Sequence, residues 1–171
     1  MIIPEHSIRD IIAGMPTVRI NSGLTVSPKF HWGNKKELNR YIQVQKENSY
    51  PLIWLLPSLE SHEGSTGQSL TKECSFIIAT RETRSSLFNN ERYKISFDIV
   101  LNPLTNNLIH ALISSNITSR IGETHDVFKL PNFSEDDGES NVTIDLWDAI
   151  SLDMNVRFSS NIKNLKQIVY D

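Results

Sequence analysis

The strongest constraint in the sequence is a two-residue alternation of apolar side chains near its C-terminal end. Apolar residues occupy almost every even position from 142 to 158, namely Val142, Ile144, Leu146, Ile150, Leu152, Met154, Val156 and Phe158. Successive side chains of a β-strand point to opposite faces, so this pattern predicts a long strand with one face on a core. Asp148 interrupts the apolar face next to Trp147, and this predicts a bulge or bend that divides the strand.

Three other segments predict further strands, so we expect a sheet. Residues 52–56 are apolar throughout and lie between two prolines, which is typical of a short strand covered on both faces or placed across an interface. Trp54, at its centre, is therefore a candidate interface residue. After an expected mobile hairpin tip at 58–71, the chain should return as a strand at 71–81. Residues 93–101 alternate apolar and polar side chains and predict another strand.

Three amphipathic segments predict helices that cover this sheet. The first spans residues 4–15, where isoleucines recur at helical spacing after a proline. The second begins at Asn34, which can cap a helix together with Glu37 three residues later. The third follows Asn102 and Pro103, a cap residue and a first-turn proline, and carries a broad apolar stripe that should lie on the sheet.

The remaining segments are polar or rich in turn-forming residues. Residues 17–33 predict an extended arm or loose hairpin, and 114–140 predict a long surface loop in which only 127–130 indicate a short strand. We therefore expect a single α+β domain at residues 1–158, with an antiparallel or mixed sheet with long hairpins packed by two to three helices. The tail at 159–171 keeps apolar residues and is expected to dock on this core or on a neighbouring chain.

Composition limits the environment and the partners of the chain. Its 171 residues carry a formal charge of −3 and a hydrophobic fraction of 39%, which suits a folded domain and gives nucleic acid no general attraction. Cys74 is the single cysteine, so an intramolecular disulfide is impossible, and its apolar neighbours predict a buried, inert thiol. The first residues lack the pattern of a secretion signal, and no apolar stretch has the length of a membrane span. We expect an intracellular protein that does not enter a membrane.

The sequence shows no cluster of reactive side chains. Its five histidines are scattered, and no pair has the spacing of two metal ligands on one helix. Asp145 and Asp148 flank Trp147 and admit two interpretations. They can be paired carboxylates in the cleft of a small enzyme or ligand-binding module. Alternatively they form a strand corner, in which Trp147 fills a gap and the aspartates bind backbone N–H groups or basic residues of a neighbouring chain. We expect the second, and hence no catalysis, metal or cofactor.

The order of these elements carries a resemblance to a known group of proteins. It runs helix, arm, helix, apolar strand, hairpin strands through Phe76-Ile77-Ile78 and Ile95-Ser96-Phe97-Asp98-Ile99, helix after Asn102-Pro103-Leu104, and strand through Asp145-Leu146-Trp147-Asp148-Ala149 to Phe158. Over roughly residues 4–158 it resembles the tail-terminator and neck-ring proteins of tailed bacteriophages, and most of all those of crAss-like phages and their prophage relatives.

The resemblance implies a structural virion protein of the neck or tail, made in the cytoplasm of the bacterial host. It implies a homo-oligomeric ring of six or twelve subunits at the head-to-tail junction, in contact with neighbouring neck, portal or tail proteins. Double-stranded DNA would pass through its central channel without sequence readout. Candidate channel-facing residues are Lys72, Arg81, Arg84 and Arg92, for which an ordinary solvated surface is the alternative. The family has no catalytic residues to transfer to this chain.

Overall fold

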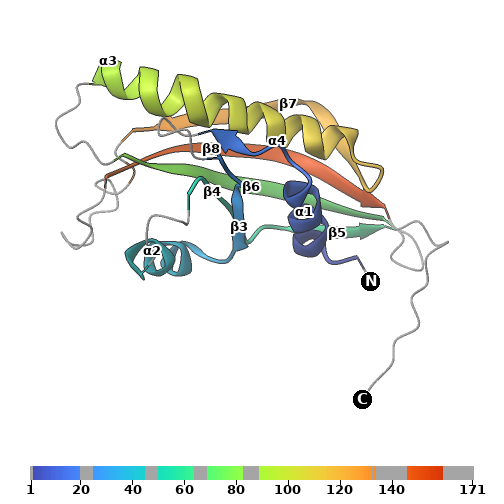
Figure 1. Cartoon of the computed structure of the whole chain (residues 1–171). Coiled ribbons are helices and arrows are strands. Elements are labelled where there is room, and N and C mark those ends of the chain that lie inside the picture. Colours follow the sequence, from blue (N-terminus) through green and yellow to red (C-terminus); the bar gives the residue numbers. More distant parts are fainter. Residues whose placement is uncertain are drawn as a thin grey trace.

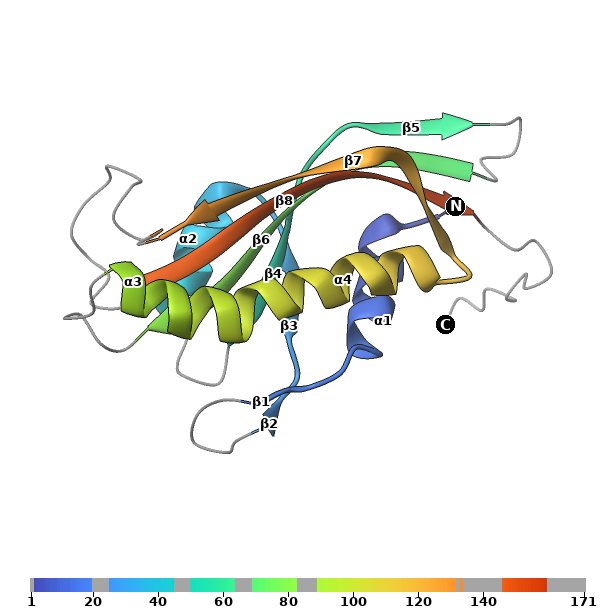
Figure 2. The same ribbon diagram turned by 90° about the horizontal axis from the view of Figure 1, so that it is seen from above.

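The fold is α+β, with one curved mixed sheet between helices (Figures 1 and 2). It was obtained as a computed structural model. The residues that it describes are 2–19, 25–44, 50–63, 69–82, 89–131, 133 and 146–159. The predicted fold class is therefore confirmed at the level of an α+β chain with a mixed sheet. The C-terminal tail from residue 160 onward lies outside the described residues.

Two long antiparallel strands form the centre of the sheet. β6 (Ser69–Glu82) pairs with β8 (Leu146–Ser159) without a break in register, from Ser69 opposite Ser159 to Glu82 opposite Leu146. The alternation predicted for the last strand is confirmed, because its even-numbered residues from 148 to 158 are buried. The predicted bulge or bend at Trp147 and Asp148 is wrong. Asp148 keeps the regular pairing with β6. Its side chain is buried on the same face of the sheet as Ile150 and Leu152, where a carboxylate requires a charged partner.

β7 (Thr118–Leu130) pairs with the other side of β8 and forms one edge of the sheet. The prediction of a loop at 114–140 is therefore wrong for residues 118–126, whereas the short strand predicted at 127–130 is confirmed as the last part of β7. An edge strand with little burial has no clear apolar alternation, which explains why its sequence is typical of a loop. The bulge that was expected in the last strand lies here instead, as a register shift between Ile121 and Asp126. Gly122 lies within it at φ 81°, a conformation that favours glycine.

Three shorter strands continue the sheet on the other side of β6. β4 (Leu52–Leu56) pairs antiparallel with the second half of β6, and β5 (Glu60–Glu63) pairs with the first half. β3 (Lys29–Trp32) pairs parallel with β4 and forms the second edge. The expected loose hairpin at 17–33 corresponds to β1 (Val18–Arg19) and β2 (Thr25–Val26), whereas β3 belongs to the main sheet.

A long helical rod crosses one face of the sheet (Figures 1 and 2). It consists of α3 (Asn89–Arg92), the π-helical segment η2 (Tyr93–Leu101) and α4 (Asn102–Ser114). The strand predicted at 93–101 is therefore wrong, and Asn102 continues a helix instead of capping one. The wide π turns end at Leu101, two residues before Pro103, and a wider turn relieves the clash between a proline ring and the carbonyl of the preceding helical turn.

The misassignment has a simple geometric origin. Tyr93, Phe97 and Leu101 are spaced by four residues, and residues four apart share a face both in a strand and in a helix. Ile95 and Ile99 would decide between the two, because in a strand they would be buried with Phe97. Ile99 is half-exposed, whereas Phe97 and Leu101 are fully buried. The buried stripe continues along the rod at helical spacing through Leu104, Leu108 and Leu112.

Helices on both faces enclose two apolar clusters. The larger cluster lies between the sheet, the helical rod and α1 (Pro4–Ala13), whose Ile8 and Ile12 are buried. The smaller cluster lies on the opposite face under α2 (Lys35–Val44) and contains Leu38, Trp54 and Trp147 among its members. The capping box predicted for α2 is confirmed: the Asn34 backbone N–H donates to Glu37 Oε2 over 2.8 Å, and the Glu37 backbone N–H donates to Asn34 Oδ1 over 3.0 Å.

Candidate functional site

The predicted interface residues that the structure describes lie inside the protein. Trp54 is buried, and its indole N–H donates to the Gly33 carbonyl over 2.8 Å. Trp147 is buried with its ring edge against Tyr50, at 4.5 Å between the ring centres. The prediction that these tryptophans contact another chain is therefore wrong for this structure. Both belong to the cluster under α2, which provides the second layer that a doubly covered strand needs.

Asp148 is fully buried and pairs with Arg92, with 3.7 Å between Arg92 Nε and Asp148 Oδ2. Asp145 lies outside the described residues, so the predicted pairing of the two aspartates stays a prediction. The pair links the start of the helical rod to β8. A substrate has no access to a carboxylate buried in this way, so Asp148 has a structural role. Its basic partner belongs to the same chain and not to a neighbouring one, which differs from the predicted strand corner.

Of the four basic residues predicted to face a channel, two are buried, one is half-buried and one lies outside the described residues. Lys72 and Arg92 are buried within the chain, so the prediction that they line a channel is wrong. Both side chains point into the protein interior, where a charge is retained only with a partner. Arg81 is half-buried on the opposite face of β6, across from Trp147. Arg84 lies outside the described residues.

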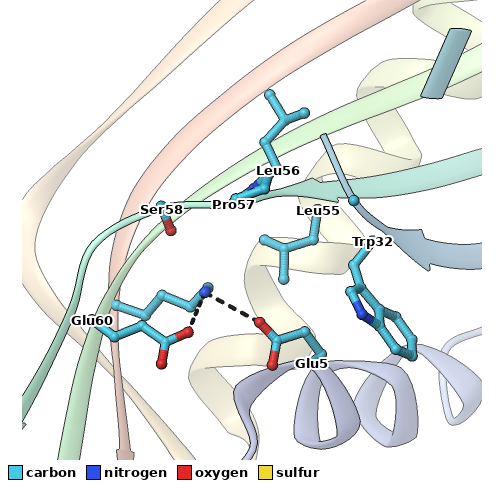
Figure 3. Close-up of a pocket in the computed structure, with 9 residues that line it drawn as sticks. Glu5, Trp32, Leu55, Leu56, Pro57, Ser58 and Glu60 are labelled. Carbon is cyan, nitrogen blue, oxygen red and sulfur yellow. Dashed lines mark hydrogen bonds and ion pairs between the residues drawn. The ribbon is translucent and has the colours of Figure 1, made fainter. Parts of the chain in front are cut away.

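Lys72 is the centre of a cluster of three charged side chains from three elements. Glu60 of β5 lies directly opposite Lys72 of β6 in the strand register, and Glu5 comes from the first turn of α1. Lys72 Nζ lies 2.5 Å from Glu60 Oε1 and 3.2 Å from Glu5 Oε1 (Figure 3). The Lys72 side chain is only 3% exposed, compared with 21% for Glu5 and 31% for Glu60. The ammonium therefore lies beneath two carboxylates that face the solvent.

These contacts change the acid–base behaviour of Lys72. Burial is the largest single influence and lowers the pKa of the ammonium, but the hydrogen bonds and charges of Glu60 and Glu5 together outweigh it and raise the pKa. Lys72 therefore stays protonated at neutral pH. A protonated amine cannot attack a carbonyl group, so its role here is electrostatic: it holds the two carboxylates in place.

The cluster lies in a pocket of about 210 Å³ between α1, the end of β3 and the segment from β4 to β5. The apolar part of its wall includes Trp32, Leu55 and Pro57. Ser58 also lines it, and the Ser58 hydroxyl is buried without a hydrogen-bond partner among the residues that the structure describes. Two carboxylates and one ammonium leave the pocket with a net charge of −1.

Sequence reasoning missed this site, although one signal for it was present. Lys72 stands in the run Leu70, Lys72, Cys74, at alternate positions of β6 whose apolar members face the core. A charge at such a position requires a buried partner, so an inward-facing ion pair could have been predicted there. The identity of that partner could not, because Glu5 and Glu60 reach Lys72 only through tertiary contacts.

A second pocket, of about 290 Å³, lies on the opposite face of the sheet at the β7 bulge. Its lining includes Glu73, Asp126 and Asp153, and Asp126 lies directly opposite Asp153 in the strand register. Within the described part of the chain, no group of three His, Cys, Asp or Glu side chains could hold a metal ion. Cys74 is buried nearby, and burial raises the pKa of its thiol to about 12, so the inert thiol predicted from the sequence is confirmed.

No family model matches the sequence, and no curated protein matches it. Of the helices that the structure describes, none combines the length and apolar character that crossing a membrane requires.

Proposed function

We propose that this chain is a structural subunit that associates with copies of itself through the β7 edge of its sheet. One observation carries this proposal: β7 is a thirteen-residue edge strand with an exposed aromatic side chain, Phe128, which is 59% exposed. Val127 beside it is also exposed. An edge strand has unpaired backbone groups, and closed assembly with a second chain is one way in which proteins cover such an edge.

We further propose that the copies close into a ring, as in a phage head-to-tail connector or tail terminator. The resemblance in element order supports it, although the segment at 93–101 is a helix and not the strand included in that order. In such a ring the subunit acts by surface complementarity, and DNA passes through the channel without base readout. With Lys72 and Arg92 buried, a basic channel surface would have to come from other residues.

The alternative, an enzyme or ligand-binding module built on Asp145 and Asp148, has weaker support. Asp148 is inaccessible to solvent and forms an ion pair with Arg92. It lies on the face of the sheet that the helical rod covers, whereas the β7 bulge pocket lies on the opposite face. A structural subunit requires no reactive group at this position. We therefore retain self-association as the proposed function.

The proposal is tested by the mass of the particle in solution. Light scattering after size exclusion should give a defined oligomer at micromolar concentration, and negative-stain images should show rings. Phe128→Glu places a charge on the proposed contact and should release monomers with unchanged secondary structure. The control is Val44→Glu, at a residue of α2 that is 71% exposed and lies outside the β7 edge. A wild-type monomer at every concentration, or equal dissociation by both variants, would contradict the proposal.

A further inference from the structure

The pocket around Lys72 presents negative charge outward. Both contacts to the ammonium use the Oε1 atoms of Glu5 and Glu60, so the Oε2 atom of each carboxylate remains available to a ligand. The ammonium is the buried member of the cluster and the carboxylates are the exposed members. An approaching group therefore meets two carboxylates first, and this arrangement excludes phosphate or carboxylate ligands by charge repulsion.

The hydrogen-bonding capacity of the pocket matches a ligand with several N–H donors. Glu5 and Glu60 each offer a carboxylate Oε2 atom that can accept hydrogen bonds. Two carboxylates in one small pocket suit a group that donates in several directions. Ser58 also lines the pocket, but its hydroxyl oxygen is buried and makes no contact with the ligand.

Trp32 supplies the other part of the site. Its indole ring lines the pocket and is half-exposed, as Figure 3 shows beside Glu5. A cation over an indole face is attracted by the electron density of the ring, and arginine makes this contact more often than lysine. A guanidinium is also planar, weakly hydrated and equipped with five N–H donors, whereas an ammonium is compact and strongly hydrated. Leu56 and Pro57 can contact the methylene groups that carry such a group.

We propose that this pocket binds the guanidinium group of an arginine side chain that a partner polypeptide inserts between Glu5, Glu60 and Trp32. The inference is independent of the β7 contact, because the pocket lies on a different part of the surface. Lys72 acts here as a positioning residue: it holds the carboxylates at a fixed separation, and its charge leaves the pocket with only one net negative charge. The bound arginine neutralises that charge.

The experiment titrates the whole protein with N-acetyl-arginine-N-methylamide and follows the indole N–H signal of Trp32 by NMR. The signal is assigned by its loss in Trp32→Phe. We expect a saturable shift with this probe and none with N-acetyl-citrulline-N-methylamide, which has the same shape without the charge. No shift with the arginine probe, or equal shifts with both probes, would overturn the proposal.

Variants locate the binding to this pocket. Glu60→Gln should weaken binding about tenfold or more, because a charge-assisted hydrogen bond is lost. Glu63→Gln is the matched control, with the same substitution on the same strand outside the pocket, and should leave affinity unchanged. Trp32→Ala, at an exposed position where folding should be retained, should weaken binding roughly threefold. Because this variant lacks the indole signal, its affinity and that of wild type are measured by isothermal titration calorimetry. Equal effects of the two glutamine variants would overturn the assignment.

The source of the guanidinium is tested with methylguanidine, which lacks the side-chain methylenes and the peptide. The arginine probe should bind several times more tightly, because its methylenes contact the apolar wall at Leu56 and Pro57. If methylguanidine binds as tightly as the arginine probe, the polypeptide part of the proposal is wrong and the pocket is specific for a small cation.

Discussion

Lys72 is the residue whose surroundings have the clearest energetic consequence. Its ammonium separates two carboxylates that would otherwise repel each other across a partly dry pocket. Lys72→Met should lower the free energy of unfolding by about 2 to 3 kcal/mol, less than for a fully buried pair because both carboxylates are partly exposed. Urea unfolding of wild type and variant at neutral pH measures this loss.

The pH dependence of that loss identifies its cause. Without the ammonium the two carboxylates repel each other, and acid removes this repulsion because a protonated carboxyl group carries no charge. The deficit of Lys72→Met relative to wild type should therefore shrink as the pH falls into the acid range. A deficit that stays constant with pH would indicate lost packing of the lysine stem and not lost charge.

Cys74 makes the stability of the protein depend on pH in the alkaline range. Its pKa is raised by burial from 9.0 to about 12, so in the unfolded chain the thiol ionises at lower pH than in the folded chain. The contribution of Cys74 to stability should therefore be constant below pH 9.0 and fall as the pH rises above it. In Cys74→Ala, which should be somewhat less stable at neutral pH, the decline should begin only as lysines approach their usual pKa of 10.5. Urea unfolding in a series of alkaline buffers tests this; an identical decline in both proteins would contradict it.

At the scale of elements, the helical rod makes a sharp prediction about two neighbouring residues. Phe97 is fully buried between rod and sheet, whereas Ile99 is 50% exposed. Phe97→Ala should lower the free energy of unfolding by about 3 to 5 kcal/mol through lost burial and a cavity. Ile99→Ala should cost under about 1 kcal/mol. Equal losses in urea unfolding would instead support the strand that the sequence pattern predicts.

The same rod shows how far the sequence determines the elements. Predictions held where the local signal had one interpretation: the capping box of α2, the proline start of α1 and the long alternation of β8. They failed at 93–101, where spacing by four fits both structures, and at residues 118–126 of β7, where an exposed edge carries no alternation. The Lys72 site was missed because its carboxylates come from α1 and β5 and meet only in the tertiary fold.

At the scale of the whole molecule, association and stability should be coupled. A folded state that assembles is favoured by mass action, so its thermal midpoint rises with protein concentration. We expect this rise for wild type and for Val44→Glu, and a midpoint independent of concentration for Phe128→Glu. The measurement is differential scanning calorimetry over a hundredfold range of protein concentration. Such a range changes the free energy of association by about 3 kcal/mol. A wild-type midpoint that does not move would contradict self-association.

The helix α2 covers only one end of the outer face of the sheet, which is the face opposite the helical rod. This should make the exchange of backbone amide hydrogens uneven along the sheet. At that end of β6, Ile77 and Ala79 are buried on the outer face, while at the other end Glu73 is exposed. Backbone hydrogen bonds therefore lie between two apolar layers at one end of the strand and under a single layer at the other. Amide hydrogens along β6 should exchange with deuterium in a gradient, slowest near Ile77 and fastest near Ser69, so the sheet opens from one end.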